Sequence, residues 1–263
     1  MGVQLSRRMS ALAALVTEGN RLADVGTDHG YVPIALVQSG RIPSAIAMDV
    51  AEGPLGRARE HIREQGLDTY IETRQSDGLS RLRPGEADTV LIAGMGGMLM
   101  LRILKAAEGR LMGVRELILQ PQSEIHLVRR YLRAGGFSIA AEDVVEEDGK
   151  YYPMFRAETK ERAGGSAAGH CADAAGAPVN GPETEAFASG GADWELYYGN
   201  VGIQRSPGVL MEYLLREEQK NEAIRRQLEE RGRSVQSRME ELLQERERIQ
   251  SALRAVRRVW EEA

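Results

Sequence analysis

Short apolar runs alternate with stretches of helical periodicity over the first 160 residues. Four runs bounded by Gly, Asp or Pro predict buried strands at residues 21–25, 45–48, 87–93 and 116–119, and a shorter run adds residues 70–74. Between them, apolar positions recur with helical spacing at residues 31–38, 54–65, 98–107 and 124–134. This alternation predicts an α/β fold in which helices cover both faces of a parallel sheet.

Two further extended segments follow at residues 137–146 and 151–159, with no helical stretch between them. The intervening turn, Glu147-Asp148-Gly149, suits a hairpin. We therefore expect an antiparallel pair of strands to close the parallel sheet.

Beyond residue 207 the apolar spacing becomes that of heptads. One series runs from Leu210 to Leu228 and a second from Val235 to Trp260, in steps of three and four residues. Gly232 can end the first helix and Ser234 can cap the second. The short connection predicts an antiparallel coiled-coil hairpin. The pattern leaves open whether this hairpin supports the first domain, dimerises or binds a partner.

The segment between these two regions has no apolar periodicity. Residues 163–192 contain 7 glycines and 10 alanines among 30 residues, a composition typical of a flexible insertion or linker. The sequence therefore predicts three parts, which are a first domain at 1–160, a linker at 161–207 and a coiled-coil domain at 208–263.

Composition excludes several classes of protein. The chain has 263 residues, is 42% hydrophobic and carries a net charge of −5, which excludes wholesale disorder. No apolar run is long enough to span a bilayer, and Met1 to Arg8 lacks the apolar core of a signal peptide. The single cysteine, Cys171, excludes a disulfide framework and a thiolate metal site. We expect a cytoplasmic protein that uses no metal and no membrane, as a monomer or weak homo-oligomer.

The turn after the first predicted strand, Asp24 to Gly30, is the first candidate ligand site, because open α/β sheets bind ligands at the carboxyl ends of their strands. Gly26 permits a sharp turn, and Gly30 lets a helix start close to the sheet. Asp28 replaces the middle glycine of the dinucleotide motif G-x-G-x-x-G. A carboxylate there would repel a pyrophosphate and can pair with the cationic end of an amino acid, which favours S-adenosylmethionine over NAD.

The second and third predicted strands also end at acidic residues. Asp49 can accept hydrogen bonds from both hydroxyls of a ribose, and Asp77 beside Gly78 can contact an adenine amino group. Each acid alone could be an ordinary turn former, but together they suit an adenosyl cofactor without phosphate. The fourth strand leads into Gly94-Met95-Gly96-Gly97, where we favour the close approach of a ligand over close helix packing.

Seven motifs follow one another along the chain. They are Leu5-Ser-Arg-Arg8, Asp24-Val-Gly-Thr-Asp-His-Gly-Tyr31, Ile42-Pro-Ser-Ala-Ile-Ala-Met-Asp49, Ser76-Asp-Gly78, Ile92-Ala-Gly-Met-Gly-Gly97, Gln120-Pro-Gln-Ser-Glu124 and Glu147-Asp-Gly-Lys-Tyr-Tyr-Pro153. Over about residues 4–160, and more loosely in its C-terminal helices, the chain resembles the bacterial TrmK family of tRNA (adenine-N1)-methyltransferases, which modify adenine 22. The resemblance implies a Rossmann-like class I methyltransferase domain, S-adenosylmethionine as donor, tRNA as partner and a C-terminal coiled coil.

Methylation of adenine N1 needs orientation and a dry site more than a protein nucleophile, because N1 has its own lone pair. Asp28 could stabilise the charge that develops on the base or help an N6 proton to leave. Many base methyltransferases hold the base with Asn-Pro-Pro-Tyr after the fourth strand, where this chain has residues 94–97. His29, Tyr31 and Gln120 are therefore candidates for holding the base, with roles in the loop or core as the alternative.

A tRNA also requires basic side chains outside the catalytic pocket, because shape and backbone contacts select the position to be modified. The candidates are Arg7, Arg8, Arg129, Arg130, Arg133, Arg225, Arg226, Arg257 and Arg258. Any of these doublets could instead neutralise nearby glutamates. Two other functions stay open, namely a methyltransferase acting on a small molecule or protein, and a non-catalytic nucleotide-binding adaptor.

Overall fold

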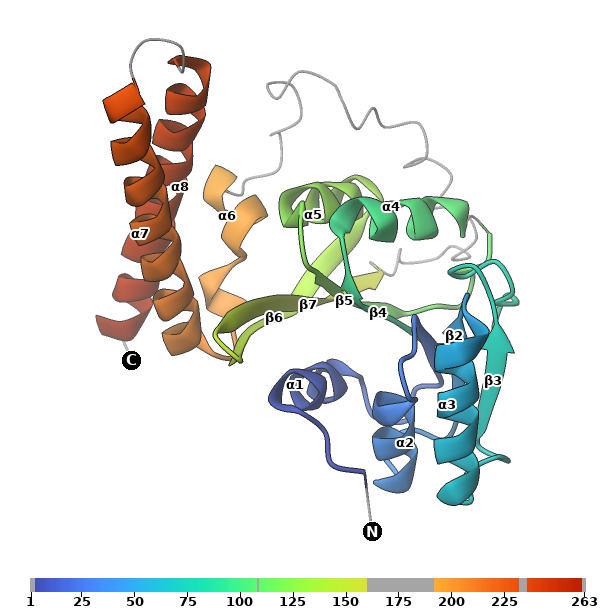
Figure 1. Ribbon diagram of the computed structural model, residues 1–263. Coiled ribbons are helices and arrows are strands. Elements are labelled where there is room, and N and C mark those ends of the chain that lie inside the picture. The colour runs from blue at the N-terminus through green and yellow to red at the C-terminus, as the bar shows by residue number, and fades with distance from the viewer. Residues whose placement is uncertain (1–2, 108, 160–191, 232–235, 262–263) are drawn as a thin grey trace, which may run out of the picture. The chain divides into compact units, whose positions relative to one another are not determined.

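Seven strands form one sheet in the computed structural model (Figure 1), which describes residues 3–107, 109–159, 192–231 and 236–261. The strand order is β3-β2-β1-β4-β5-β7-β6. The strands are β1 (Leu22–Val25), β2 (Ala45–Asp49), β3 (Ile71–Gln75), β4 (Thr89–Met95), β5 (Glu116–Pro121), β6 (Phe137–Glu147) and β7 (Lys150–Thr159).

The sheet is mixed. β1 lies parallel to β2 and β4, β3 is parallel to β2, and β5 is parallel to β4. β7 pairs antiparallel with β5. The last described strand of the chain, β7, therefore lies between β5 and the edge strand β6. The predicted parallel sheet with an antiparallel closing segment is confirmed.

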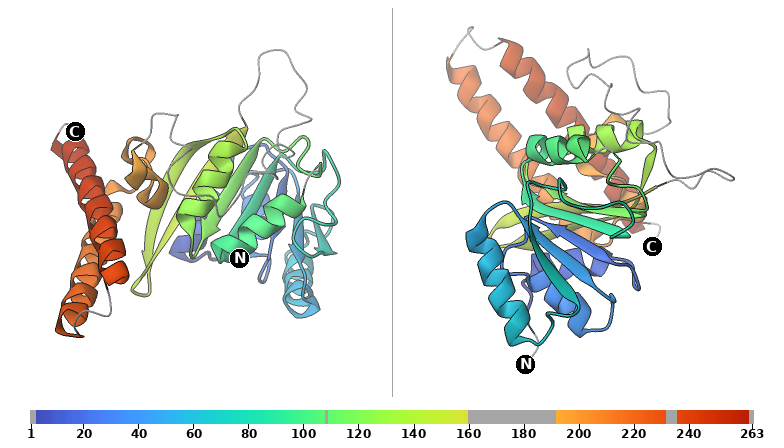
Figure 2. Two further views of the ribbon diagram at one scale, coloured as in Figure 1. Left: turned by 90° about the horizontal axis from the view of Figure 1, so that it is seen from above. Right: turned by 90° about the vertical axis from the view of Figure 1, so that its right-hand side faces the viewer.

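Helices cover both faces of this sheet (Figure 2). α4 (Gly97–Ala106) and α5 (Ile125–Ala134) lie on one face, and α1 (Arg7–Leu15), α2 (Tyr31–Gln38) and α3 (Glu52–Glu64) pack on the other. The predicted strands and helices of this region are confirmed to within a few residues. α1 is an addition, since no helix was expected before the first strand.

Alternation along each strand supplies the two cores. On β4, Val90 and Ile92 face the cluster beneath α4 and α5, whereas Leu91 faces the opposite cluster. On β5, Leu119 faces the cluster beneath α4 and α5, and Ile118 faces the opposite cluster. Because neighbouring side chains of a strand point to opposite faces, a run of consecutive apolar residues fills both layers.

The strand register brings the predicted ligand turns to one edge of the sheet. Val25 lies beside Met48 and Ile92, so the turns that follow β1, β2 and β4 are neighbours. Ala93 pairs with Gln120, which places the end of β5 next to the glycine-rich end of β4. Parallel strands with their carboxyl ends together form the edge at which such sheets bind ligands.

A second compact unit consists of Pro182–Ala263 together with Glu142–Val144. It contains α6 (Asp193–Tyr198), the short 3-10 helix η1 (Val201–Ile203), α7 (Pro207–Arg231) and α8 (Gln236–Glu261). Residues 192–207 therefore carry helices, which corrects the prediction that the linker extends to 207. α6 forms because Leu196 and Tyr198 are buried. Residues 160–191, with Cys171, and the turn at 232–235 lie outside the described residues.

α7 and α8 run in opposite directions. Asn221 of α7 donates a hydrogen bond to the carbonyl of Leu242 on α8 at 2.9 Å, while Glu218, earlier on α7, accepts one from Gln250, later on α8. Of the predicted heptad positions, Ile224 and Trp260 are exposed, whereas the following are buried: Leu210, Leu214, Asn221, Leu242, Ile249, Leu253 and Val256. No helix among the described residues is long and apolar enough to cross a membrane.

Candidate functional site

The turn between β1 and α2 contains a buried carboxyl group. Asp24 is 8% exposed, and burial raises its pKa to about 6, with the nearby charge of Asp49 adding to the rise. Gly26 has a φ of +75°, and the Met95 side chain of β4 lies directly against it, so a side chain at Gly26 would be strained and displaced. The close approach at this turn is therefore made, at least in part, by the protein itself.

Three aromatic rings stack beside this turn. The ring centroids of His29 and Tyr31 are 5.1 Å apart, and each lies 5.3 Å from the ring of His61 on α3. Asp28 is exposed and pairs with Arg57 at 3.1 Å and with His29 at 3.3 Å. The candidates Asp28, His29 and Tyr31 thus form one group on the α3 side of the turn.

The ends of β2 and β3 meet as the sequence predicts. One carboxylate oxygen of Asp49 accepts a hydrogen bond from the backbone of Ala51 at 2.7 Å, and the other has no hydrogen-bond partner in the part of the chain that the structure describes. The backbone N–H of Ser76 donates to the Asp49 carbonyl at 2.8 Å, which holds the exposed Asp77 near this strand end. A Cβ at Gly78 would lie 2.9 Å from Ile103, so close packing explains the absence of a side chain there, and its predicted contact with the cofactor stays a prediction.

The glycines at the end of β4 divide into two kinds. A Cβ at Gly96 would lie 3.1 Å from the Ser123 hydroxyl, and a Cβ at Gly97 would collide with the Ser123 carbonyl. Packing against the segment before α5 explains the absence of a side chain at these two glycines, and the predicted contact of Gly96 with a ligand stays a prediction. Gly94 is exposed, has a φ of +75° and has only the ends of the Arg8 and Gln122 side chains nearby.

Gln120, at the end of β5, holds Gly94 and Arg8. Its side-chain oxygen accepts hydrogen bonds from the Gly94 N–H at 3.0 Å and from the Arg8 guanidinium at 3.3 Å. Gln120 is fully buried, so it supports the rim of the site instead of holding a base directly, which corrects its predicted role. It lies in a different group of contacts from Asp28, His29 and Tyr31.

A further group of contacts surrounds Arg8, which the sequence predicts only as an RNA-binding residue. The Arg8 guanidinium lies 5.2 Å from the centre of the Tyr152 ring and 3.9 Å from the Glu147 carboxylate. Glu147 also accepts hydrogen bonds from the Arg8 backbone N–H and the Ser6 hydroxyl, and these contacts lower its pKa. Two of the sequence motifs, at residues 5–8 and 147–153, therefore meet in space. Their presence in the motif set was the only signal for this contact.

Comparison with known proteins agrees with this geometry. A methyltransferase-domain family model matches residues 5–155. The tRNA (adenine(22)-N(1))-methyltransferase of Bacillus subtilis is 38% identical over 160 residues, covering 61% of this chain and 67% of the relative. The crystal structure of the B. subtilis m1A22 tRNA methyltransferase TrmK superposes with a TM-score of 0.75 at 28% identity, covering 95% of this chain and 99% of that one. The chain belongs to the TrmK family.

A second TrmK-like structure includes the methyl donor. Streptococcus pneumoniae Sp1610 in complex with S-adenosyl-L-methionine matches with a TM-score of 0.74 at 28% identity, over 95% of this chain and all of that one. The likeness to both structures extends through the C-terminal helical region as well as the methyltransferase domain.

In this TrmK-family chain, the arginines predicted to bind RNA differ in how exposed their side chains are. Arg129 is 1% exposed and lies over the Phe155 ring, so it belongs to the core and is not a surface cation, which corrects its prediction. Arg130 and Arg133, on the same helix, are half-buried. Arg7 is 74% exposed and lies 3.8 Å from Glu146.

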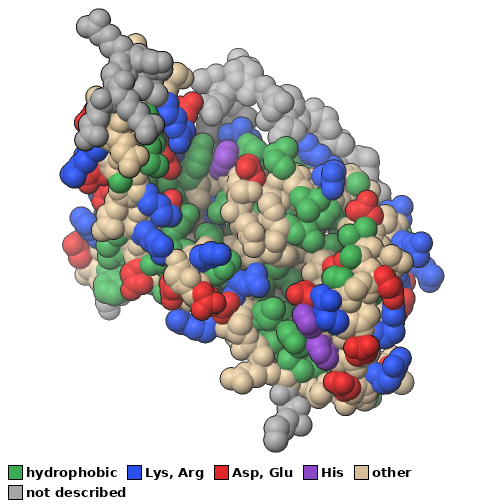
Figure 3. Space-filling model, in the orientation of Figure 1, with side chains coloured by type: hydrophobic (Ala, Val, Ile, Leu, Met, Phe, Trp, Pro, Cys, Tyr) green, Lys and Arg blue, Asp and Glu red, His purple; other side chains and the backbone are tan. Residues whose placement is uncertain are grey.

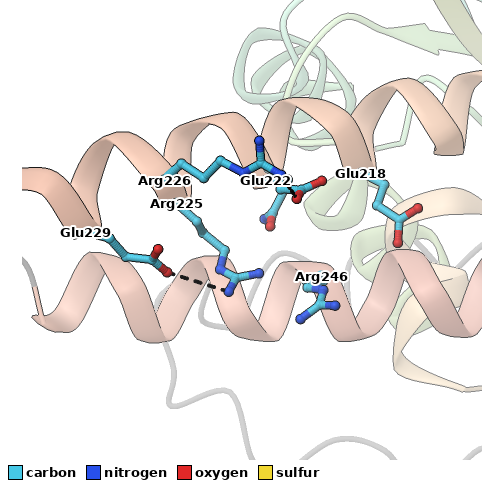
Figure 4. Close-up of a pocket in the computed structure, with 7 residues that line it drawn as sticks. Glu218, Glu222, Arg225, Arg226, Glu229 and Arg246 are labelled. Carbon is cyan, nitrogen blue, oxygen red and sulfur yellow. Dashed lines mark hydrogen bonds and ion pairs between the residues drawn. The ribbon is translucent and has the colours of Figure 1, made fainter.

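On the helical pair, charges of both signs alternate (Figure 3). Arg226 pairs with Glu222, and Arg225 lies 3.9 Å from Glu229, in a pocket that Arg246 also lines (Figure 4). This doublet matches the interpretation that arginines neutralise neighbouring glutamates. Arg257 and Arg258, by contrast, are exposed and have no ion pair within the described part of the chain. No group of three metal-binding side chains occurs among the described residues.

Proposed function

We propose that this chain transfers the methyl group of S-adenosylmethionine to N1 of adenine 22 in tRNA. The observation that carries the proposal is the 38% identity, over 160 residues, to the B. subtilis enzyme of that activity. The strand-end geometry supports the same conclusion, because its acidic side chains lie where an adenosyl cofactor requires them.

The residues at the strand ends fit the cofactor. Among the described residues, one carboxylate oxygen of Asp49 has no hydrogen-bond partner, as an acceptor for ribose hydroxyls requires. Asp24 is a buried carboxyl at the end of β1, where the cationic amino group of the methionine part would offset the cost of burying its charge. When bound, S-adenosylmethionine supplies an electrophilic methyl group on a sulfonium. We assign Gly30 and Asp77 to the walls of this site.

The chain's own residues would orient the base and the charges around it. The stacked rings of His29, Tyr31 and His61 offer an aromatic surface next to the turn, and aromatic side chains are the usual platforms for unstacked bases. Asp28 adds a carboxylate beside these rings, suited to stabilising positive charge on a methylated adenine. Gln120 fixes the Gly94 backbone that borders the other side.

We further propose that residues 208–263 form a coiled-coil hairpin that contributes to tRNA binding. The heptad burial on α7 and α8 supports the hairpin, and the exposed Arg257 and Arg258 support the contact. The domain division proposed is a methyltransferase domain at 1–160 followed by a linker and this hairpin.

The test uses the full chain, tritiated S-adenosylmethionine and three acceptors, namely bulk tRNA, bulk protein and a small-molecule extract. Label is expected in tRNA alone. A matched transcript with guanine in place of adenine 22 should take up none, and primer extension should stop at position 22 of the methylated transcript. Label in protein or in the extract, with none in tRNA, would refute the proposal, and no transfer at all would favour a binding role.

A further inference from the structure

The Arg8 side chain is held across the ends of two strands with most of its donors unused. Its one side-chain hydrogen bond among the described residues goes to Gln120, at 3.3 Å, although a guanidinium has five N–H groups. Beside it, Gly94 has no side chain, and a Cβ there would come within 3.6 Å of the Arg8 Nη1. The guanidinium therefore borders the open, glycine-lined edge of the site.

The backbone that carries Arg8 is fixed independently of its side chain. Ser6 caps α1 by accepting from the N–H of Met9, and Glu147 accepts from the Arg8 N–H at 3.1 Å. The Tyr152 ring supports the guanidinium as a cation–π partner. Arg8 is thus a preorganised cation whose removal leaves the helix cap in place.

A cation at this edge needs an anionic partner during the reaction. Methyl transfer moves positive charge from sulfur to the adenine ring, so a bare guanidinium facing the base would raise the barrier. Glu147 compensates only partly, because it lies 3.9 Å away and its oxygens already accept other hydrogen bonds. The guanidinium fork instead matches a pair of oxygens of a carboxylate or phosphate.

We infer that Arg8 is the oxyanion-binding residue of this site. The inference rests on the proposed function. Two parts of the substrates carry that chemistry, which are the carboxylate of the cofactor's methionine part and a phosphate next to the target adenosine. Removing the Arg8 charge should weaken cofactor binding in the first case and reaction with tRNA in the second.

The experiment compares Arg8→Gln with Arg115→Gln in the full chain. Arg115 is 74% exposed and precedes β5 at the end opposite Gln120, so it provides the same charge change away from the site. We expect Arg8→Gln to keep its melting temperature and to lose at least tenfold either in cofactor affinity by calorimetry or in kcat/KM for tRNA at saturating cofactor. Arg115→Gln should change neither by more than about twofold.

The cofactor carboxylate and the tRNA phosphate are distinguished by which measured quantity changes. Loss of cofactor affinity in the absence of RNA identifies the carboxylate. A raised KM for tRNA, with a slope of log(kcat/KM) against log salt that is shallower by about one, identifies the phosphate. If Arg8→Gln is unstable, Arg8→Met, which removes the charge and keeps an unbranched apolar stem, takes its place in both assays.

Wild-type levels of both quantities in a folded variant would overturn the inference, provided that the wild-type chain methylates tRNA. Failure of the wild-type chain to methylate tRNA would instead count against the proposed function.

Discussion

Replacing Asp24 by Asn should make the ligand-free protein more stable at neutral pH. Burial raises the pKa of Asp24 to about 6, whereas an unfolded Asp titrates near 3.9. The two-unit difference corresponds to at most about 3 kcal/mol of unfolding free energy that the charged form costs. At roughly 2–4 °C per kcal/mol for a domain of this size, the variant should melt at a higher temperature, by at most roughly 6–12 °C.

The size of this stabilisation depends on pH. Because the folded pKa lies above the unfolded one, the stability of the wild-type chain is complete below about pH 3.9 and decreases until about pH 6. The stabilising effect of Asp24→Asn should therefore be small near pH 4.5 and reach its maximum above pH 6.5. Differential scanning calorimetry of the ligand-free proteins at pH 4.5 and 7.5 measures both values.

A matched control separates burial from a general effect of removing charge. Asp68 is exposed in the loop before β3, so Asp68→Asn should change stability by less than about 0.5 kcal/mol at either pH. Calorimetric titration should show the opposite effect of Asp24→Asn on function, a weaker affinity for S-adenosylmethionine. A variant that is less stable than wild type at pH 7.5, or a difference that does not change with pH, would refute the argument from burial.

Three further changes test the rest of the site. Asp49→Ala should weaken cofactor binding by about 1.5–3 kcal/mol in calorimetry, since ribose hydroxyls lose their acceptor, and unchanged affinity would remove that assignment. Asp28→Asn should keep the melting temperature while lowering kcat at saturating cofactor, so full activity or unfolding would contradict its role in charge stabilisation. Glu147→Gln should lower the melting temperature at pH 7, because the hydrogen bonds from Arg8 and Ser6 hold the pKa of Glu147 down. That difference should shrink as pH falls below about 4.3, and a constant difference would contradict it.

Local pattern was sufficient for most of the sheet and for the positions of two acidic residues at its strand ends. Buried strands in this fold are short apolar runs that end in a turn, so Asp24 and Asp49 could be placed at strand ends from the sequence alone. The glycines of residues 94–97 were harder, because a missing side chain indicates close approach without saying by what. Only the structure assigns Ser123 as the neighbour of Gly96 and Gly97.

The other side of the site depends on contacts between distant segments. Arg129 follows the same basic pattern as surface arginines, yet it lies over Phe155 because α5 turns that face toward β7. α1 was missed because its apolar residues form a short, alanine-rich run without an evident stop signal. Arg8 could be proposed only as a surface cation, since nothing local places it beside Gln120 of β5.

The hydrogen bond between Ser6 and Glu147 joins residues 141 positions apart. Contacts of such long sequence separation form late, because the intervening chain must first be ordered. During synthesis, β1, β2 and β4 can associate while β6 and β7 are still absent, but α1 obtains the Glu147 cap only after residue 147 has been made. Assembly of the site therefore has an order, with the turn at Gly26 before the Arg8 side. A nascent chain in which only the earlier part has formed has the strand ends assigned to the cofactor but not the guanidinium that completes them.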